Sequence, residues 1–167
     1  RSSIGQGTNN YAPVQLARYV TTIANEGNCY DLTLVNEIKN IDGRTVYKSV
    51  NVPKNTVDLT DSQWAVIKQG MRQMVSEHTS PSALINQINV NVAGKTGTAE
   101  EDTTRPDHAL FVSFAPYENP EVSVTCVIPH GYTSGNAEEL AGMVYAYMYD
   151  PDKLYTLDIT GNNQMSD

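Results

Sequence analysis

The sequence of 167 residues, 40 % of them hydrophobic, is long enough for one domain with a buried core and has no apolar stretch long enough to cross a membrane. Its net charge of −8 at pH 7 argues against a nucleic-acid surface, which needs clustered Lys and Arg. Two cysteines far apart in the sequence, Cys29 and Cys126, indicate neither a disulfide framework nor a zinc site, and we expect no metal and no cofactor.

The first part of the chain predicts a helix followed by a hairpin. We expect the helix over residues 13–25, because a proline occupies its first position and Gly27 provides a stop. Residues 32–50 predict the hairpin, since the dipeptide Asp42-Gly43 supplies the positive φ angles of a tight turn and β-branched residues flank it.

A second helix is expected over residues 60–77. Thr60 and Gln63 have the spacing of a capping box, in which each side chain bonds to the backbone N–H of the other. The expected buried stripe of this helix consists of Trp64, Ile67, Met71, Met74 and Val75. A short helical turn capped by Ser80 is predicted to follow.

Strands dominate the next part of the sequence. Ile88, Val90 and Val92 alternate with asparagines, which predicts a half-buried strand that continues into the segment VAGKTGTAE. Two further β-rich runs, residues 109–117 and 121–129, predict a meander of three antiparallel strands.

The end of the chain predicts a helix and a tail. Residues 136–149 should form a closing helix capped by Asn136, and the residues from 151 to 167 read as a polar tail. The expected fold is therefore α+β, with helices packed on an antiparallel sheet. Residues 1–150 would form the domain.

The segment VAGKTGTAE contains GKT, which also occurs in phosphate-binding loops. Such a loop needs a glycine five residues before Gly94, where this chain has Asn89, so we reject nucleotide binding. On a strand, Gly97 would let another backbone lie close, and Lys95 with the threonines would suit an extended peptide that ends in a carboxylate. Taken alone, the segment also fits an ordinary strand with an exposed lysine.

Several segments in order resemble the C-terminal half of the transpeptidase domain of class B penicillin-binding proteins. They are SSIGQG, YAPVQLARYVTTIANEG, GMRQMV, VAGKTGTAE, HALFVSFAPYENPEVSV and AGMVYAY, and together they extend over nearly all of residues 2–149. Ala12 and Ser113 depart from the residues usual in that family, without touching its chemistry. Because the chain begins at Arg1 without a targeting segment, we expect it to be a piece of a longer protein.

The resemblance implies a partial fold of the penicillin-binding and β-lactamase type, with the three strands as part of a larger sheet. The implied activity is a D,D-transpeptidase that cross-links peptidoglycan stem peptides through an acyl-enzyme and binds β-lactams. Of the family's SxxK, SxN and KTG motifs, no SxxK is present. The triads Ser49-Val50-Asn51 and Ser134-Gly135-Asn136 match SxN but lie in the wrong order along the chain, so we interpret them as chance.

The resemblance also implies roles for four residues. Lys95 would be catalytic, by placing a positive charge beside the SxN hydroxyl and relaying protons. The hydroxyls of Thr96 and Thr98 would bind the substrate carboxylate, and the backbone N–H of Thr98 would donate to the oxyanion. Gly97 would keep the strand open to the peptide. The nucleophilic serine would lie outside this chain, which alone should not react.

Partners and location follow from the same resemblance. The partners would be stem peptides, β-lactams and the N-terminal half of the same domain, with possible self-association through an exposed edge of the final strand. The parent would be anchored at the extracytoplasmic face of the bacterial cell membrane. Two alternatives stay open: a serine β-lactamase or β-lactam sensor domain, against which the GQG and PVQLA segments argue, and a non-catalytic scaffold fragment.

Overall fold

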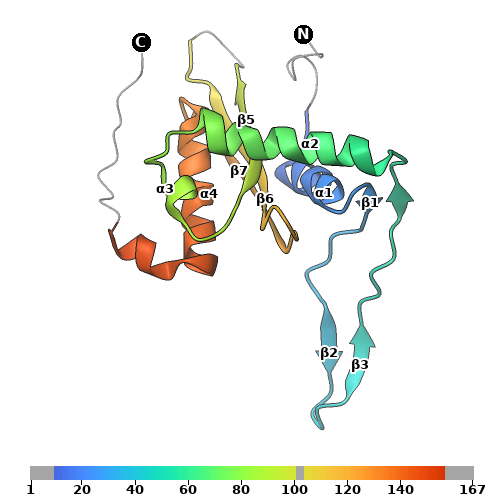
Figure 1. Ribbon diagram of the computed structural model, residues 1–167. Helices are drawn as coiled ribbons and strands as arrows, with labels where there is room; N and C mark the ends of the chain where they lie inside the picture. Colours follow the sequence, from blue (N-terminus) through green and yellow to red (C-terminus); the bar gives the residue numbers. More distant parts are fainter. Residues whose placement is uncertain (1–9, 101–103, 157–167) are drawn as a thin grey trace.

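The computed structural model describes residues 10–100 and 104–156 (Figure 1). The segment SSIGQG, the residues 101–103 and the last part of the expected tail lie outside the described residues. In chain order the elements are α1 (Pro13–Ala24), β1 (Asn28–Cys29), β2 (Glu37–Lys39), β3 (Thr45–Lys48), β4 (Asn55–Thr56), α2 (Asp61–Gln73), the π-helical turn η2 (Met74–His78), α3 (Leu84–Gln87), β5 (Ala93–Ala99), β6 (His108–Ala115), β7 (Val122–Ile128), α4 (Ser134–Tyr149) and the 3₁₀ turn η3 (Pro151–Thr156).

The central sheet is the expected antiparallel meander in the order β5-β6-β7. Helices cover both of its faces, so the α+β prediction is confirmed. On one face α1 and α2 pack against a cluster that contains Val20, Trp64 and Phe114. On the other face α3 and α4 enclose a second cluster around Phe111 and Tyr145, both of which are fully buried.

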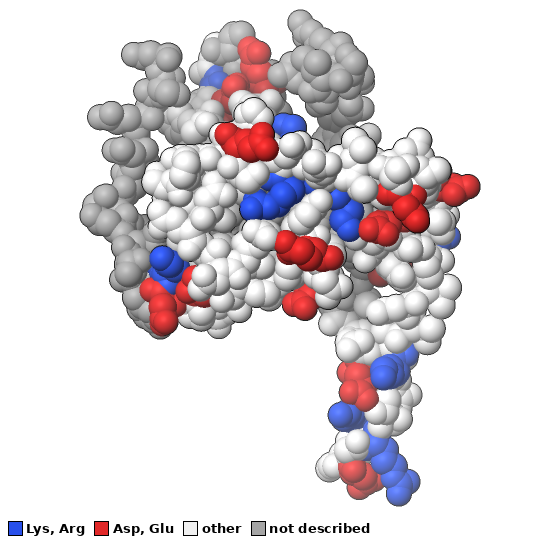
Figure 2. Space-filling model, in the orientation of Figure 1, with Lys and Arg blue, Asp and Glu red and all other residues white. Residues whose placement is uncertain are grey.

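The predicted hairpin forms a two-stranded arm that projects from the body below α1 (Figure 1). Gly43 has the expected positive φ, +77°, but Asp42 does not have one, and the turn extends from Asn40 to Arg44, so the tight turn with positive φ at both residues was wrong. The arm buries none of its strand residues, and Figure 2 shows Lys and Arg mixed with Asp and Glu along it. Short pairings of β1 with β4 close its base.

The predicted helix α2 begins with the expected capping box: the Thr60 hydroxyl accepts from the Gln63 backbone N–H, and the Gln63 side chain accepts from the Thr60 N–H. Its end differs from the prediction, because the chain winds into the π-helical turn η2 after Gln73. Trp64 and Met71 are buried as expected, but Ile67 is exposed, so its place in the buried stripe was wrong.

The strand prediction for residues 88–92 was wrong, because β5 begins only at Ala93. The backbone of this stretch bonds elsewhere: Asn91 C=O accepts from the Tyr117 N–H, and Val92 C=O accepts from Arg72 Nη1 at 3.2 Å. Ile88 and Val92 are nevertheless buried. The alternation of apolar residues with asparagines therefore predicted correctly that these two side chains are buried, although the segment lies outside the sheet.

Two predicted helix caps also differ. The short helix α3 starts after Ala83, and Ser80 instead accepts the Ser82 N–H in the preceding turn. Helix α4 starts earlier than expected, with Thr133 as its cap, and the Asn136 amide donates to Gly131 C=O. In both places a nearby hydroxyl or amide makes a local bond in the turn rather than the expected cap.

The segment after α4 begins with ordered structure rather than a free tail. Residues 151–156 form η3, and Leu154 packs against the core around Tyr145. No helix within the described ranges has the length and apolar character that a membrane span requires.

Candidate active site

The four residues singled out from the sequence lie on β5, which is an edge strand of the described sheet. β5 pairs with β6 along its whole length, from Ala93 opposite Phe114 to Ala99 opposite His108. Within the described residues its other edge pairs with no strand. A free strand edge presents backbone N–H and C=O groups to which an extended peptide can add.

The side chains of β5 alternate between the two faces of the sheet. Lys95 and Gly97 share the face of Val112 and Leu110, which is the side of α1 and α2, whereas Thr96 and Thr98 share the face of Phe111. Lys95 is exposed, and its ammonium donates to Thr96 C=O at 2.9 Å. The Thr96 hydroxyl points at the sulfur of Met74, 3.9 Å away.

The two glycines of β5 serve different purposes. A methyl group on Gly94 would lie 2.5 Å from Phe111 Cζ, so this position must be glycine for the core to pack. A methyl group on Gly97 would meet only Leu110 Cβ, at an ordinary 3.4 Å. The packing inside the described structure therefore explains Gly94 and leaves Gly97 open to a role at the surface.

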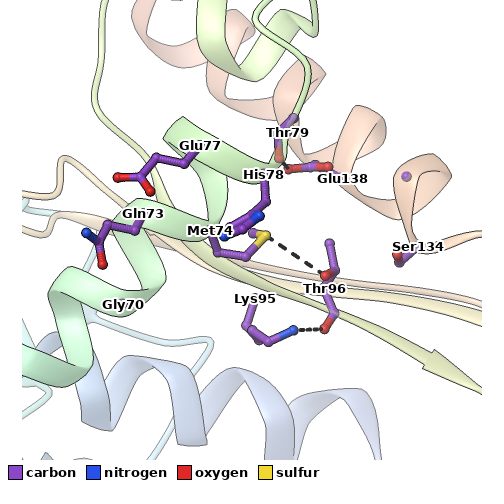
Figure 3. Close-up of a pocket in the computed structure, with 11 residues that line it drawn as sticks. Gly70, Gln73, Met74, Glu77, His78, Thr79, Lys95, Thr96, Ser134 and Glu138 are labelled. Carbon is purple, nitrogen blue, oxygen red and sulfur yellow. Dashed lines mark hydrogen bonds between the residues drawn. The ribbon is translucent and has the colours of Figure 1, made fainter.

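A cavity of about 630 Å³ opens beside β5 (Figure 3). Lys95 and Thr96 form one part of its wall, and the end of α2 with η2 and the start of α4 form the rest. The lining residues are Gly70, Gln73, Met74, Glu77, His78, Thr79, Lys95, Thr96, Ser134, Gly135 and Glu138. Gly97 and Thr98 are not among them.

Glu138 is the buried acid of this cavity, with only 8 % of its surface exposed. The Thr79 hydroxyl donates to Glu138 Oε1 (Figure 3). Burial raises the pKa of the Glu138 carboxyl, and the bond from Thr79 opposes that shift.

Sequence reasoning missed Glu138 and Thr79. The available signal was an acid within an apolar stripe, because Glu138 precedes Ala141 by three residues and Tyr145 by seven on the buried side of α4. Thr79 gave no signal, since it lies 59 residues from Glu138 in the sequence.

The two SxN-like triads lie in different places. Ser49-Val50-Asn51 belongs to the projecting arm and does not line the cavity. Ser134 and Gly135 do line it, at the first turn of α4. The sequence analysis did not predict that Ser134 would line the cavity. Its position after the last strand still distinguishes its triad from the SxN motif of the implied family.

Two of the three histidines, His108 and His130, contact each other. His108 begins β6, and its Nδ1 accepts the backbone N–H of His130 at 3.0 Å. The two imidazole rings lie 4.8 Å apart. His78 lines the cavity.

Comparison with known proteins identifies the family to which this chain belongs. A family model for the penicillin-binding protein transpeptidase domain matches residues 1–148. The chain belongs to this family, so the resemblance found in the sequence is confirmed.

Relatives of known name support the same assignment. The chain is 35 % identical over 132 residues to penicillin-binding protein 2B of Streptococcus pneumoniae, a match that covers 72 % of this chain and 19 % of that protein. It is 28 % identical over 161 residues to the peptidoglycan D,D-transpeptidase MrdA of Acinetobacter baumannii, covering 87 % and 23 % respectively. The chain thus spans about a fifth of the length of these relatives.

Solved structures show the same fold. The imipenem acyl-enzyme complex of penicillin-binding protein A from M. tuberculosis matches with a TM-score of 0.75 at 27 % identity, over 88 % of this chain and 33 % of that one. Penicillin-binding protein 2B from Streptococcus pneumoniae strain R6 matches with a TM-score of 0.69 at 30 % identity, over 93 % and 26 %. The partial transpeptidase fold that the resemblance implied is confirmed.

Proposed function

We propose that this chain is the C-terminal part of a peptidoglycan D,D-transpeptidase and that β5 is one wall of its acyl-transfer cleft. The observation that carries the proposal is the edge of β5 that no strand in the described residues pairs with, because this edge holds the KTG residues beside an open cavity. In the proposed reaction a serine that precedes Arg1 in the whole protein forms an acyl-enzyme with one stem peptide. The amine of a second stem peptide then takes the acyl group.

Each residue of the motif has a place in this scheme. Lys95 is exposed on the side of α1 and α2, where its ammonium would assist proton transfer at the serine. The Thr96 hydroxyl lies in the cavity wall and would bind the carboxylate of the stem peptide, together with the hydroxyl of Thr98. The backbone N–H of Thr98 would donate to the oxyanion, and Gly97 would leave room for the peptide backbone.

Exposed apolar residues on α1 and α2 indicate that another part of the protein covers these helices. Tyr19 on α1 is 62 % exposed and Val66 on α2 is 69 % exposed. Leu59, Val66 and Ile67 line a shallow, mostly apolar hollow at α2. Apolar surface of this kind is what the preceding half of the domain would bury. That half would also carry the membrane anchor and place the protein on the extracytoplasmic side.

Intact-mass spectrometry after incubation with a penicillin tests the proposed function. We expect no covalent adduct on this chain alone, because it holds no SxxK serine. We expect one penicillin per molecule on the parent protein that includes the preceding sequence, mapped to a serine before Arg1. A stoichiometric adduct on a serine of this chain, or no adduct on the parent, would contradict the proposal.

The final strand offers a second test. Within the described residues β7 pairs only with β6, so its outer edge is free. We propose that the preceding half of the domain covers this edge and that the isolated chain associates with itself there. Sedimentation velocity should then show dimers or larger species for the chain alone and a monomer for the parent. A strictly monomeric chain at high concentration would argue against this use of the edge.

A further inference from the structure

The chain is anchored where it enters β5, by a bridge of side chains that starts at Arg72 near the end of α2. Arg72 Nη1 donates to Val92 C=O at 3.2 Å, and Arg72 Nη2 donates to Asn91 Oδ1 at 2.9 Å. The Asn91 amide in turn donates to Glu118 Oε1 at 2.6 Å, in the connection between β6 and β7. Arg72, Asn91 and Glu118, here called the entry bridge, thus join the helix to that connection across the start of the KTG strand.

Both ends of the entry bridge carry charge. Arg72 contributes a guanidinium and Glu118 a carboxylate, and hydrogen bonds with one ionised partner are stronger than those between neutral groups. The hydrogen bond from Asn91 holds the pKa of the Glu118 carboxyl below its usual range, and the charge of Arg72 acts in the same direction. A backbone bond fixes the same stretch, because Asn91 C=O accepts the Tyr117 N–H at 2.8 Å. The start of β5 is therefore held from two sides.

The entry bridge acts on the edge of β5 that the proposed substrate would use. Val92 C=O accepts from Arg72, and Thr96 C=O accepts from Lys95. Because both carbonyls accept side-chain donors and lie an even number of positions apart, they point to the same edge, the one that β6 does not occupy. The N–H of Thr98 points to this edge by the same alternation. Through Val92, Arg72 thus holds the edge on which the proposed oxyanion donor lies.

We propose that Arg72 is a positioning residue of the acyl-transfer cleft, because it fixes the place of β5 relative to the rest of the domain. This inference rests on the proposed function and adds to it a residue outside the KTG motif that acts through the strand. The nucleophilic serine would not move with β5, whereas the Thr98 N–H would. A displacement of about 1 Å at a reacting centre can slow a reaction about 100-fold, because the reacting atoms lose their alignment.

Binding of the ligand carboxylate should survive a shift of β5. Thr96 and Thr98 both lie on this strand, so their hydroxyls move together and keep their mutual geometry. The loss should therefore appear in the acylation step and not in the binding step before it. A direct contact between Arg72 and the ligand would give the opposite pattern, with weaker binding and an unchanged acylation step.

The test uses the parent protein with Arg72→Ala. Stopped-flow kinetics over a range of concentrations of a chromogenic β-lactam give two separate quantities, the dissociation constant of the non-covalent complex and the rate constant of acylation. Lys68→Ala is the matched control, since Lys68 lies one turn earlier on α2 and bonds to Glu26 Oε1 at 2.9 Å, at the turn after α1. This variant removes an ion pair from the same helix and leaves the entry bridge intact.

We expect Arg72→Ala to lower the acylation rate constant about tenfold to 100-fold and to change the dissociation constant by less than about threefold. Arg72→Lys should recover part of the rate, because it keeps the charge and lacks the fork that reaches two acceptors. Lys68→Ala should leave both quantities unchanged. An unchanged rate constant in Arg72→Ala overturns the proposal, and so does a raised dissociation constant with a normal rate constant. Equal slowing in Lys68→Ala overturns it too, because the cause would then be a less stable helix.

Asn91→Ala tests the entry bridge without changing α2. Asn91 is exposed, so its replacement should leave the protein folded. The variant removes one of the two acceptors of Arg72 and the link to Glu118, and acylation should slow about threefold or more. If Arg72→Ala does not fold, this variant decides, and an unchanged acylation rate in it overturns the proposal. A parent that penicillin does not acylate overturns the proposed function itself, whereas normal acylation of both the parent and these variants overturns only the role of Arg72.

Discussion

Lys95→Ala in the parent protein is expected to slow acylation by a penicillin about 100- to 1,000-fold. Lys95 is exposed on β5, and among the described residues its one hydrogen-bond partner is Thr96 C=O, so its removal should cost little folding energy. The acylation rate should fall because the Lys95 ammonium would stabilise the developing charge and transfer protons at the nucleophilic serine. Stopped-flow acylation with a chromogenic β-lactam measures it.

Lys48→Ala is the control for this variant. Lys48 is exposed on β3 of the projecting arm, away from the cavity, and its replacement should leave the acylation rate unchanged. The unfolding midpoints of both variants should lie close to that of the unchanged protein. If Lys95→Ala retains acylation within a factor of about three, Lys95 has no role in proton transfer.

Alanine at the two glycines of β5 should have opposite consequences. Gly94→Ala places a methyl group 2.5 Å from Phe111 Cζ, in a side chain that is fully buried. The core must shift, so we expect the free energy of unfolding to fall by about 1–3 kcal/mol. Denaturant unfolding of the parent protein measures this loss.

Gly97→Ala should preserve stability and impair the reaction. Its methyl group would lie 3.4 Å from Leu110 Cβ, an ordinary contact, and Gly97 does not have the positive φ that would strain alanine. We expect a stability change within about 0.5 kcal/mol and acylation slowed about tenfold or more, since the methyl group displaces the ligand along the strand. Equal losses of stability in both variants would show that Gly97 is also needed for packing.

Short-range patterns in the sequence predicted most of the fold correctly. The proline and glycine that bound α1, the capping box of α2 and the Asp42-Gly43 turn all act within a few residues of one another, and the structure retains them. The three-strand meander followed from alternation and short connections in the same way.

The errors arose where a distant group replaced a local one. Residues 88–92 have the alternation of a strand, but their backbone bonds to Arg72, Tyr117 and Asp150 instead of to a neighbouring strand. Ile67 has the spacing of a core residue, yet its side of α2 faces outward in the described structure. Alternation and helical spacing predict which apolar side chains lie on the same face of a strand or helix. They do not predict which other element packs against that face.

The sequence by itself therefore determined the family and the strand that carries the KTG residues, because a motif and a period of two are local properties of the chain. Only the tertiary structure decided that the end of α2 and the start of α4 enclose a cavity beside Lys95. It also brought Thr79 to Glu138 across 59 residues of sequence. Such pairs depend on how helices pack on the sheet, and no local pattern records that packing.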